Sequence, residues 1–354
     1  MIDNTARAGR DGDVLAVVSQ SGPTVTFFDA ATDAPLGVLN VLAEPHELCF
    51  DPTQRLLWCT SAYYGGYYHA NTGRRTQLTV IDPDARRIVD VVDLAPEHGP
   101  HGLALDPVRG RMYVSVEGSD DRPGGVVVID TETRKPLGRI DTGAPGPHWF
   151  VIDPAGRRGY ATNKEAPFVS FVDLETGTTT TTVEVPGSEG LAVSADGREL
   201  YVAAPYVGLK PGVADHRPQP GIRVIDTEAE SIAAVWPTER NVLPVHLTST
   251  GTLLAGQLRM VADGSSGLGR QQPGTLTAFS TTTREQIAEV QLTGAFPLTI
   301  TASPDGRLGY VAAVSSSTVD IIDLHTWQLL GSLNIAKRGE PGAHGLAYIP
   351  RPTN

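Results

Sequence analysis

Residues 101–141 read HGLALDPVRGRMYVSVEGSDDRPGGVVVIDTETRKPLGRID, and this stretch decides the fold. An apolar strand at 101–106 leads through a turn with Pro and Gly into an aromatic strand at 111–116. After a variable loop, a strand rich in valine ends at Asp130, and a last strand follows at 136–141. Turns that contain Asp, Pro and Gly supply the backbone angles of tight hairpins. The stretch therefore predicts a unit of four antiparallel strands.

This unit recurs along the 354 residues of the chain. Its third strand is expected to end at seven positions: Asp29, Asp82, Asp130, Asp173, Asp226, Ser280 and Asp323. These positions lie 43 to 54 residues apart, a spacing typical of propeller blades with four strands each. The sequence thus predicts an all-β protein, a seven-bladed β-propeller with four antiparallel strands in each blade.

The two ends of the chain complement each other. The chain starts with three strands, at 13–19, 24–29 and 35–41, and it ends with a lone first strand at 344–349. Pairing them closes the ring and removes an exposed sheet edge. We therefore expect one domain over residues 1–354. Its predicted blades are 46–94, 101–142, 148–186, 189–237, 245–292, 297–334, and 344–349 with 13–41.

Several short motifs resemble the YVTN-repeat propeller family. Residues 160–163 read YATN, and the hairpin signature occurs as SPDG at 303–306 with YVA at 310–312. The same hairpin recurs as SADG at 194–197 with YVA at 201–203. The resemblance covers almost the whole chain and implies the propeller fold. Because that superfamily includes lyases, lactonases, metal oxidases and binding scaffolds, it does not select a function.

The composition restricts the partners. A net charge of −12 and a pI of about 5.2 predict repulsion from nucleic-acid phosphates and from anionic membranes. Residues 1–13 are polar and contain no apolar segment of a secretory signal, so we expect a cytoplasmic location. The expected partner is a small-molecule substrate, and the expected state is a monomer or a weak homo-oligomer.

The strongest candidate site lies where the first strands begin. Their predicted first residues are His46, His101, His148, Glu189, Val245, Leu298 and His344. Ring closure makes the four histidines and Glu189 consecutive around the channel. Converging imidazoles predict a divalent metal site, foremost Fe2+ or Zn2+, with Mg2+ as a further option. His46, His101, His148 and His344 are the predicted ligands, and Glu189 is a fifth ligand, a base or a partner of a ligand.

Topology places the loops between second and third strands on the same face as these residues. Three such loops are long, at 61–77, 204–221 and 258–274. Long loops on a rigid scaffold commonly carry binding sites. The predicted substrate-binding residues are Tyr63, Tyr64, Tyr67, Tyr206 and Arg259. Glu117 and Glu165, at the ends of two second strands, join Glu189 as predicted catalytic residues.

The histidines also have a structural interpretation. The Pro-His-Gly turn of residues 100–102 could have been copied with the repeat and kept for local hydrogen bonds. Strand alternation adds a second argument, because His101, Leu103 and Leu105 share one parity and could all face a neighbouring blade. The tyrosines of the first long loop could likewise pack within that loop.

These observations favour a metal-dependent small-molecule enzyme. Several acid and base groups at the rim incline the prediction toward lyase or cyclase chemistry. The four axial histidines are similar to the iron site of carotenoid-cleaving oxygenases, and the Pro-His-Gly units resemble streptogramin-type lyases. An Fe(II)-dependent oxygenase, a lactonase-like hydrolase and a non-enzymatic scaffold remain the alternatives. The chain has no Gly-x-Ser-x-Gly elbow, which disfavours serine hydrolysis.

Overall fold

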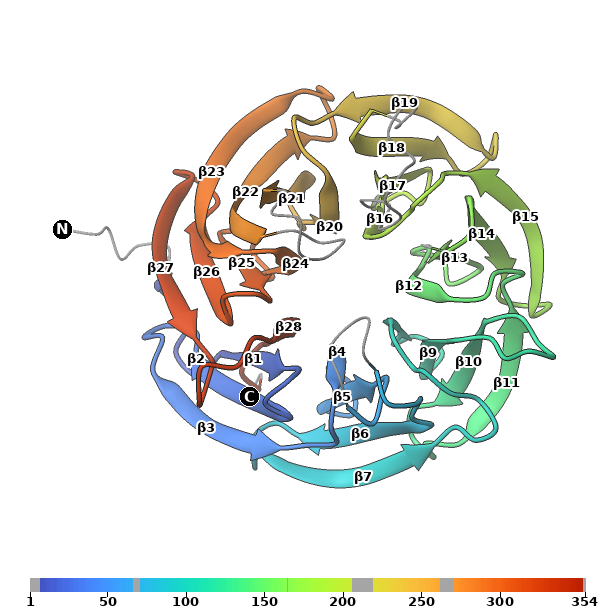
Figure 1. The fold of residues 1–354 in the computed structure, drawn as a ribbon, viewed down its shortest axis with the longest axis horizontal. Helices are drawn as coiled ribbons and strands as arrows, with labels where there is room; N and C mark the ends of the chain where they lie inside the picture. Colours follow the sequence, from blue (N-terminus) through green and yellow to red (C-terminus); the bar gives the residue numbers. More distant parts are fainter. Residues whose placement is uncertain (1–6, 66–70, 164, 206–218, 262–269, 353–354) are drawn as a thin grey trace.

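Seven four-stranded sheets surround a common axis in the computed structural model of the chain (Figure 1). The structure describes residues 7–65, 71–163, 165–205, 219–261 and 270–352. Every regular element in these residues is a β-strand, as predicted. We number the blades one (β4–β7), two (β8–β11), three (β12–β15), four (β16–β19), five (β20–β23) and six (β24–β27), with β28 and β1–β3 as blade seven.

The four strands of a blade run from the axis outward. The first strands are β28 (Ala343–Ile349), β4 (Pro45–Asp51), β8 (Leu103–Asp106), β12 (Pro147–Ile152), β16 (Leu191–Val193), β20 (Val242–Leu247) and β24 (Pro297–Ala302). The second strands are β1 (Val14–Ser19), β5 (Leu56–Ser61), β9 (Arg111–Val116), β13 (Arg158–Asn163), β17 (Glu199–Ala204), β21 (Thr252–Val261) and β25 (Leu308–Ala313). The first strands lie innermost and the fourth strands form the rim (Figure 1).

The outer two strands of each blade complete the sheets. The third strands are β2 (Thr24–Asp29), β6 (Gln77–Asp82), β10 (Gly125–Asp130), β14 (Phe168–Asp173), β18 (Gly221–Asp226), β22 (Arg270–Ser280) and β26 (Thr318–Asp323). The fourth strands are β3 (Pro35–Asn40), β7 (Arg87–Asp93), β11 (Pro136–Asp141), β15 (Thr178–Glu184), β19 (Ser231–Pro237), β23 (Gln286–Ala295) and β27 (Gln328–Asn334). All seven predicted third-strand ends are confirmed.

Those ends form regular turns on one face, which we call the lower face. The Asp226 carboxylate accepts hydrogen bonds from the backbone N–H groups of Glu228 and Ala229, at 2.9 and 2.8 Å. Asp130 accepts equally from the backbone N–H and the hydroxyl of Thr133, at 2.7 and 2.8 Å. An Asp side chain that replaces a backbone acceptor stabilises such a turn, which explains why the repeat ends in this residue.

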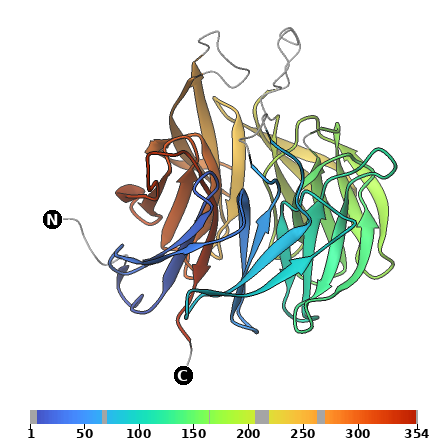
Figure 2. The same cartoon turned by 60° about the horizontal axis from the view of Figure 1, so that its bottom comes forward.

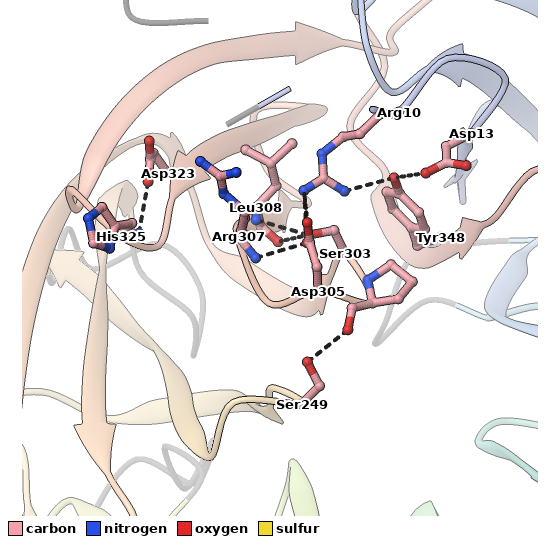
Figure 3. Close-up of polar contacts among 11 residues, drawn as sticks. Arg10, Asp13, Ser249, Ser303, Asp305, Arg307, Leu308, Asp323, His325 and Tyr348 are labelled. Carbon is pink, nitrogen blue, oxygen red and sulfur yellow. Dashed lines mark hydrogen bonds and ion pairs between the residues drawn. The ribbon is translucent and has the colours of Figure 1, made fainter. Parts of the chain in front are cut away.

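The ring closes between β1 and β28, as predicted, with Val14 opposite Ile349 and Val17 opposite Leu346. A polar network reinforces this seam on the lower face (Figure 3). The buried Arg10 guanidinium donates to both carboxylate oxygens of Asp305, at 2.8 and 2.9 Å, and to the Tyr348 hydroxyl at 3.1 Å. Tyr348 in turn donates to Asp13 at 2.5 Å. The N-terminal segment is thereby attached to blades six and seven.

The hydrophobic core lies between adjacent blades rather than in one central mass. Trp58 of blade one packs with Met112 of blade two, and Tyr113 of blade two lies 5.8 Å from Phe150 of blade three, measured between ring centroids. Each buried side chain of this size contributes roughly 2 kcal/mol through removal of apolar surface from water. The channel ends of the first strands are thus held by rigid packing on both sides.

The opposite face, which we call the upper face, is where the first strands begin. The β21–β22 hairpin is longer than the second and third strands of the other blades and projects from the ring in the turned view (Figure 2). Among the residues that the structure describes, no helix has the length and apolar character needed to cross a membrane.

Candidate metal centre

Several first strands begin with β-bulges, and in blades one, three and seven these bulges lie at a histidine. In blade one, Pro45 pairs with Ser61 and Leu48 with Cys59, so His46 and Glu47 together oppose Thr60. The register shifts in the same way at the start of β12 and near the start of β28. Two residues opposite one break the alternation of side chains and bend the strand. The parity argument concerned His101, which precedes β8 (Leu103–Asp106), so the alternation of that strand does not fix where its side chain lies.

Hydroxyl side chains satisfy the backbone groups that the bulges release. Thr60 Oγ1 accepts a hydrogen bond from the Glu47 backbone N–H at 2.9 Å. In blade two, Ser115 Oγ accepts from the Gly102 N–H and donates to the His148 carbonyl of blade three, both at 2.7 Å. Buried backbone groups require such partners. The hydroxyls at these second-strand positions therefore serve the scaffold and not a reaction.

Glycines after the first-strand residue allow neighbouring blades to approach closely. Gly102 N–H donates to the His148 carbonyl at 3.1 Å, and a Cβ added to Gly345 would lie 2.5 Å from the His46 carbonyl oxygen. Gly190 N–H donates in the same way to the Leu243 carbonyl at 2.9 Å. Leu243, and not Val245, thus occupies in blade five the place of the histidines, which differs by two residues from the sequence-based alignment.

The four imidazoles meet at the upper end of the axis. His46 lies 4.0 Å from His344, 4.7 Å from His101 and 5.8 Å from His148, and His101 lies 5.0 Å from His148, all between ring centroids. These rings come from blades seven, one, two and three. His46, His101 and His344 are almost completely buried, and the His148 side chain is 11% exposed. Residues as far apart in the chain as His46 and His344 therefore form one cluster.

Three carboxylates flank these rings. Glu189 Oε2 lies 3.0 Å from His148 Nδ1, Glu47 Oε1 lies 3.1 Å from His344 Nδ1, and Glu117 Oε1 lies 3.7 Å from His101 Nε2. Buried carboxylates are costly without nearby positive charge. Carboxylates beside the imidazoles are also the usual outer partners of histidine metal ligands. Glu189 therefore lies where a partner of a ligand would, one of the roles predicted for it.

The tautomer of His101 follows from one contact. Its Nδ1 lies 2.8 Å from the Gly99 carbonyl oxygen, which can only accept, so Nδ1 carries a hydrogen and donates. In the neutral ring this leaves the Nε2 lone pair available to a metal. The local hydrogen bond of the structural interpretation thus exists, and it engages Nδ1 rather than Nε2.

The potential ligand atoms fall into two groups rather than one. One group consists of His46, His101 and His148, and the other of His46, Glu47 and His344. Within each group all ligand atoms lie within 4.8 Å of one another, and His46 belongs to both. Among the described residues, the four histidines do not form a single mutually close group. The predicted ligands are thus brought together in a different grouping from the one expected.

Glu117 joins the cluster to the rim. It accepts a hydrogen bond from the Tyr63 hydroxyl at 2.6 Å and pairs with Arg74 Nε at 2.8 Å. The Tyr63 ring lies edge-on to His101, 5.7 Å between centroids. Burial, together with the Glu117 charge, raises the pKa of Tyr63 well above its usual range. The Tyr63 hydroxyl therefore remains protonated at neutral pH.

Other predicted residues lie farther out or outside the described residues. Tyr64 is 54% exposed, and the Arg75 guanidinium covers its ring at 4.6 Å. Glu165 and Arg259 are exposed. Glu165 is nevertheless near enough for its charge to contribute to the raised pKa of Tyr63. Tyr67 and Tyr206 lie outside the residues that the structure describes.

Sequence reasoning missed Glu47 and Glu44. Strict alternation places Glu47 away from His46, and only the bulge brings both into one cluster. Its signal was the dipeptide His46-Glu47, because the other first-strand histidines are followed by Gly or Trp. Glu44 is buried just before β4, and burial raises its pKa to about 7 despite a hydrogen bond with Gln20. This acid group was not considered because it lies outside the predicted strand.

Comparison with known proteins supports the fold. No protein-family model matches the chain. The chain is 24% identical over 236 residues to the uncharacterized protein YncE of Salmonella typhi, over 65% of this chain and 61% of YncE. YncE of Salmonella typhimurium (strain LT2) aligns with the same values. The chain thus spans about three fifths of the length of the curated relatives that it matches.

Solved structures agree with this fold. Hydrazine synthase of Kuenenia stuttgartiensis superposes with a TM-score of 0.65 at 14% identity, over 82% of this chain and 86% of that chain. Dihydro-heme d1 dehydrogenase NirN, in complex with DHE, superposes with a TM-score of 0.59 at 14% identity, over 93% of this chain and 65% of that chain. At such identity the likeness concerns the fold alone. Similarity to YncE and the seven blades together support a YncE-like propeller.

Proposed function

We propose that this protein is a metal-dependent enzyme that acts on a small molecule at the upper end of the propeller axis, through lyase- or cyclase-type chemistry. One observation carries the proposal: His46, His101 and His148 come from three consecutive blades, and their ligand atoms lie within 4.8 Å of one another. A three-histidine set with open positions suits catalytic Zn2+ and also Fe2+. The cytoplasmic location and a monomeric or weakly associated state belong to the same proposal.

The surrounding residues have complementary roles in this proposal. Glu189 orients His148, and the Gly99 carbonyl orients His101. A bound divalent ion would supply a Lewis acid that polarises a carbonyl of the substrate. In this proposal Glu117, whose side chain is 17% exposed, accepts a proton, and the Tyr63 hydroxyl donates the hydrogen bond that holds Glu117 in position. Arg74 Nε pairs with Glu117 Oε2 at 2.8 Å and holds this carboxylate in place.

An Fe(II)-dependent oxygenase is the second candidate, because an all-imidazole ligand set also holds Fe(II) without neutralising its charge. The metal decides between the two candidates. Protein purified with Zn2+ as its tightly bound ion, and without oxygen uptake when reconstituted with Fe2+, would favour the lyase or cyclase reaction. Oxygen uptake that depends on added Fe2+ would favour the oxygenase.

The test is metal analysis of untagged protein beside two variants. His101→Ala removes a ligand, and His325→Ala is the matched control because His325 is exposed on the lower face. We expect near-stoichiometric metal in the wild type and in the control, and its loss in His101→Ala. Metal that binds only the folded state should also raise Tm with concentration, less so as pH falls and the imidazoles protonate.

Absence of metal would contradict the proposal. If neither the wild type nor the control carries metal, and added Zn2+, Fe2+ and Mg2+ leave Tm unchanged, then the proposal fails. A non-enzymatic scaffold would then be the better interpretation, with the histidines as packed structural residues.

A further inference from the structure

We propose that the cluster binds two divalent cations, one on His46, His101 and His148 and a second on His344 and Glu47, with His46 shared between them. This inference rests on the proposed function and extends it from a single-ion site to a two-ion site. It concerns the second group of ligand atoms, which a single ion leaves unused.

Ligand distances argue against one ion on all four histidines. A protein-bound Zn2+ lies about 2.1 Å from each imidazole nitrogen, so two of its ligand atoms are at most about 4.2 Å apart. His46, His101 and His148 come near this limit, with ligand atoms within 4.8 Å of one another. His344 enters such a group only with His46 and Glu47. An ion on the first three rings therefore leaves His344 without a metal contact.

The surroundings of His344 favour a bound cation. Its side chain is 1% exposed, and Glu47 Oε1 lies 3.1 Å from its Nδ1. Both of its ring nitrogens are buried without a hydrogen-bond partner among the described residues. A buried polar atom without a partner costs roughly 1–3 kcal/mol. A metal ion held by Nδ1 together with Glu47 would remove that cost for Nδ1.

Glu47 is the second ligand of this group. Its side chain is 7% exposed, and its Oε1 lies between His344 Nδ1 at 3.1 Å and His46 Nδ1 at 3.6 Å. A carboxylate in so buried a position requires positive charge close by. An imidazole and a carboxylate together form a common ligand pair for Zn2+ and related divalent ions.

The shared residue places the two ions next to each other. The ring centroid of His46 lies 4.0 Å from that of His344 and 4.7 Å from that of His101, so the two ligand groups adjoin at His46. His46 would serve both ions only through its two different ring nitrogens, and its Nδ1 is the nitrogen that lies 3.6 Å from Glu47 Oε1. Two neighbouring cations would together bind oxygen atoms of one substrate. Substrates with paired or anionic oxygen atoms are the chemical class that such a centre binds.

The experiment counts ions with Co2+ and Zn2+ as probes. Metal-free protein is titrated with Co2+, whose visible absorption reports its ligands, and the bound metal is then measured after gel filtration. Zn2+ is titrated in the same way to test whether the count depends on the ion. Wild type is compared with Glu47→Gln, His344→Ala, His148→Ala and the lower-face control His325→Ala.

We expect two equivalents in the wild type and in the control, and one in Glu47→Gln and in His344→Ala. The Co2+ absorption that remains in these two variants should match the first equivalent bound by the wild type. Glu47→Gln keeps the size of the side chain, so circular dichroism and thermal melting that match the wild type show that it has folded.

The outcomes separate this inference from the proposed function. One equivalent in the wild type, unchanged by His344→Ala, overturns the second ion and leaves the three-histidine centre intact. One equivalent that is lost in both His344→Ala and His148→Ala also overturns it, because all four histidines would then bind one ion. No bound metal in the wild type overturns the proposed function and this inference together.

Discussion

The two faces of the propeller are built from the ends of the same strands, yet they differ in regularity. On the lower face, the third strands of six blades end in Asp, and these side chains form the same kind of turn, as at Asp130 and Asp226. On the upper face, first strands begin with bulges, and their first residues range from His46 to Glu189 and Leu243. Repetition therefore builds the lower face, and divergence between blades builds the upper one.

The upper face is itself divided. Blades seven, one, two and three supply the imidazoles, whereas blades five and six supply a buried apolar cluster with Leu243, Phe296 and Leu298. A polar cluster beside an apolar wall is the usual character of a small-molecule site. The comparison teaches that the scaffold accepts His, Glu or Leu at this position, so the fold alone does not account for four histidines on one side.

The largest effect is expected from His46→Ala, because His46 belongs to both ligand groups. Removing a shared ligand should lower the affinity for the tightest ion about a thousandfold, or roughly 4 kcal/mol. Competition with a chromophoric chelator measures the change, and His325→Ala is the control from the lower face. Unchanged affinity in His46→Ala would remove the functional distinction between the faces.

Gly345→Ala should have the next largest effect. The added Cβ would lie 2.5 Å from the His46 carbonyl oxygen and 2.8 Å from the Glu47 Cα, and both are backbone atoms that cannot move aside easily. We expect a loss of about 3 kcal/mol in the free energy of unfolding, measured with urea. Gly138→Ala is the control, because a Cβ there meets nothing within 4 Å. Equal stability of the two variants would contradict the close approach of blades seven and one.

A smaller loss is expected from Arg10→Ala at the seam on the lower face. The change removes the bidentate contact with Asp305 and the contact with Tyr348 (Figure 3). Charged hydrogen bonds of this kind contribute about 2 kcal/mol. Urea unfolding measures the loss, and metal content should stay unchanged because the seam lies away from the histidines. Lost metal in this variant would show that the two faces are coupled.

The smallest effect is expected from Asp130→Asn, and it should depend on pH. Hydrogen bonds from the backbone N–H and the hydroxyl of Thr133 lower the pKa of Asp130. A lowered pKa in the folded state adds stability above the unfolded value of about 4, and this stability is lost as pH falls through the folded value. The variant should therefore melt below the wild type at pH 7, with a difference that disappears at about pH 2. A constant difference would indicate that the charge of Asp130 contributes nothing.

The repeat pattern was sufficient for the fold because each blade is a local unit. Turn residues such as Asp130 and Asp226 accept hydrogen bonds from residues two or three positions away, and such contacts can be predicted from the local sequence. Closure was equally predictable, because a lone strand at one end and three at the other leave one way to complete the ring. The placement of Tyr63 near Glu117 was only partly predictable, since a loop side chain can turn in several directions.

By itself, the sequence determined seven blades, their closure and a set of histidines at equivalent positions, because alternation and turn chemistry act over short distances. Only the tertiary structure decided how those histidines group. The bulges that rotate Glu47 beside His46, and the closing strand that brings His344 to the same place, depend on backbone register between segments far apart in the chain. Register of this kind is set by the packing of one blade against the next, and local sequence patterns do not predict that packing.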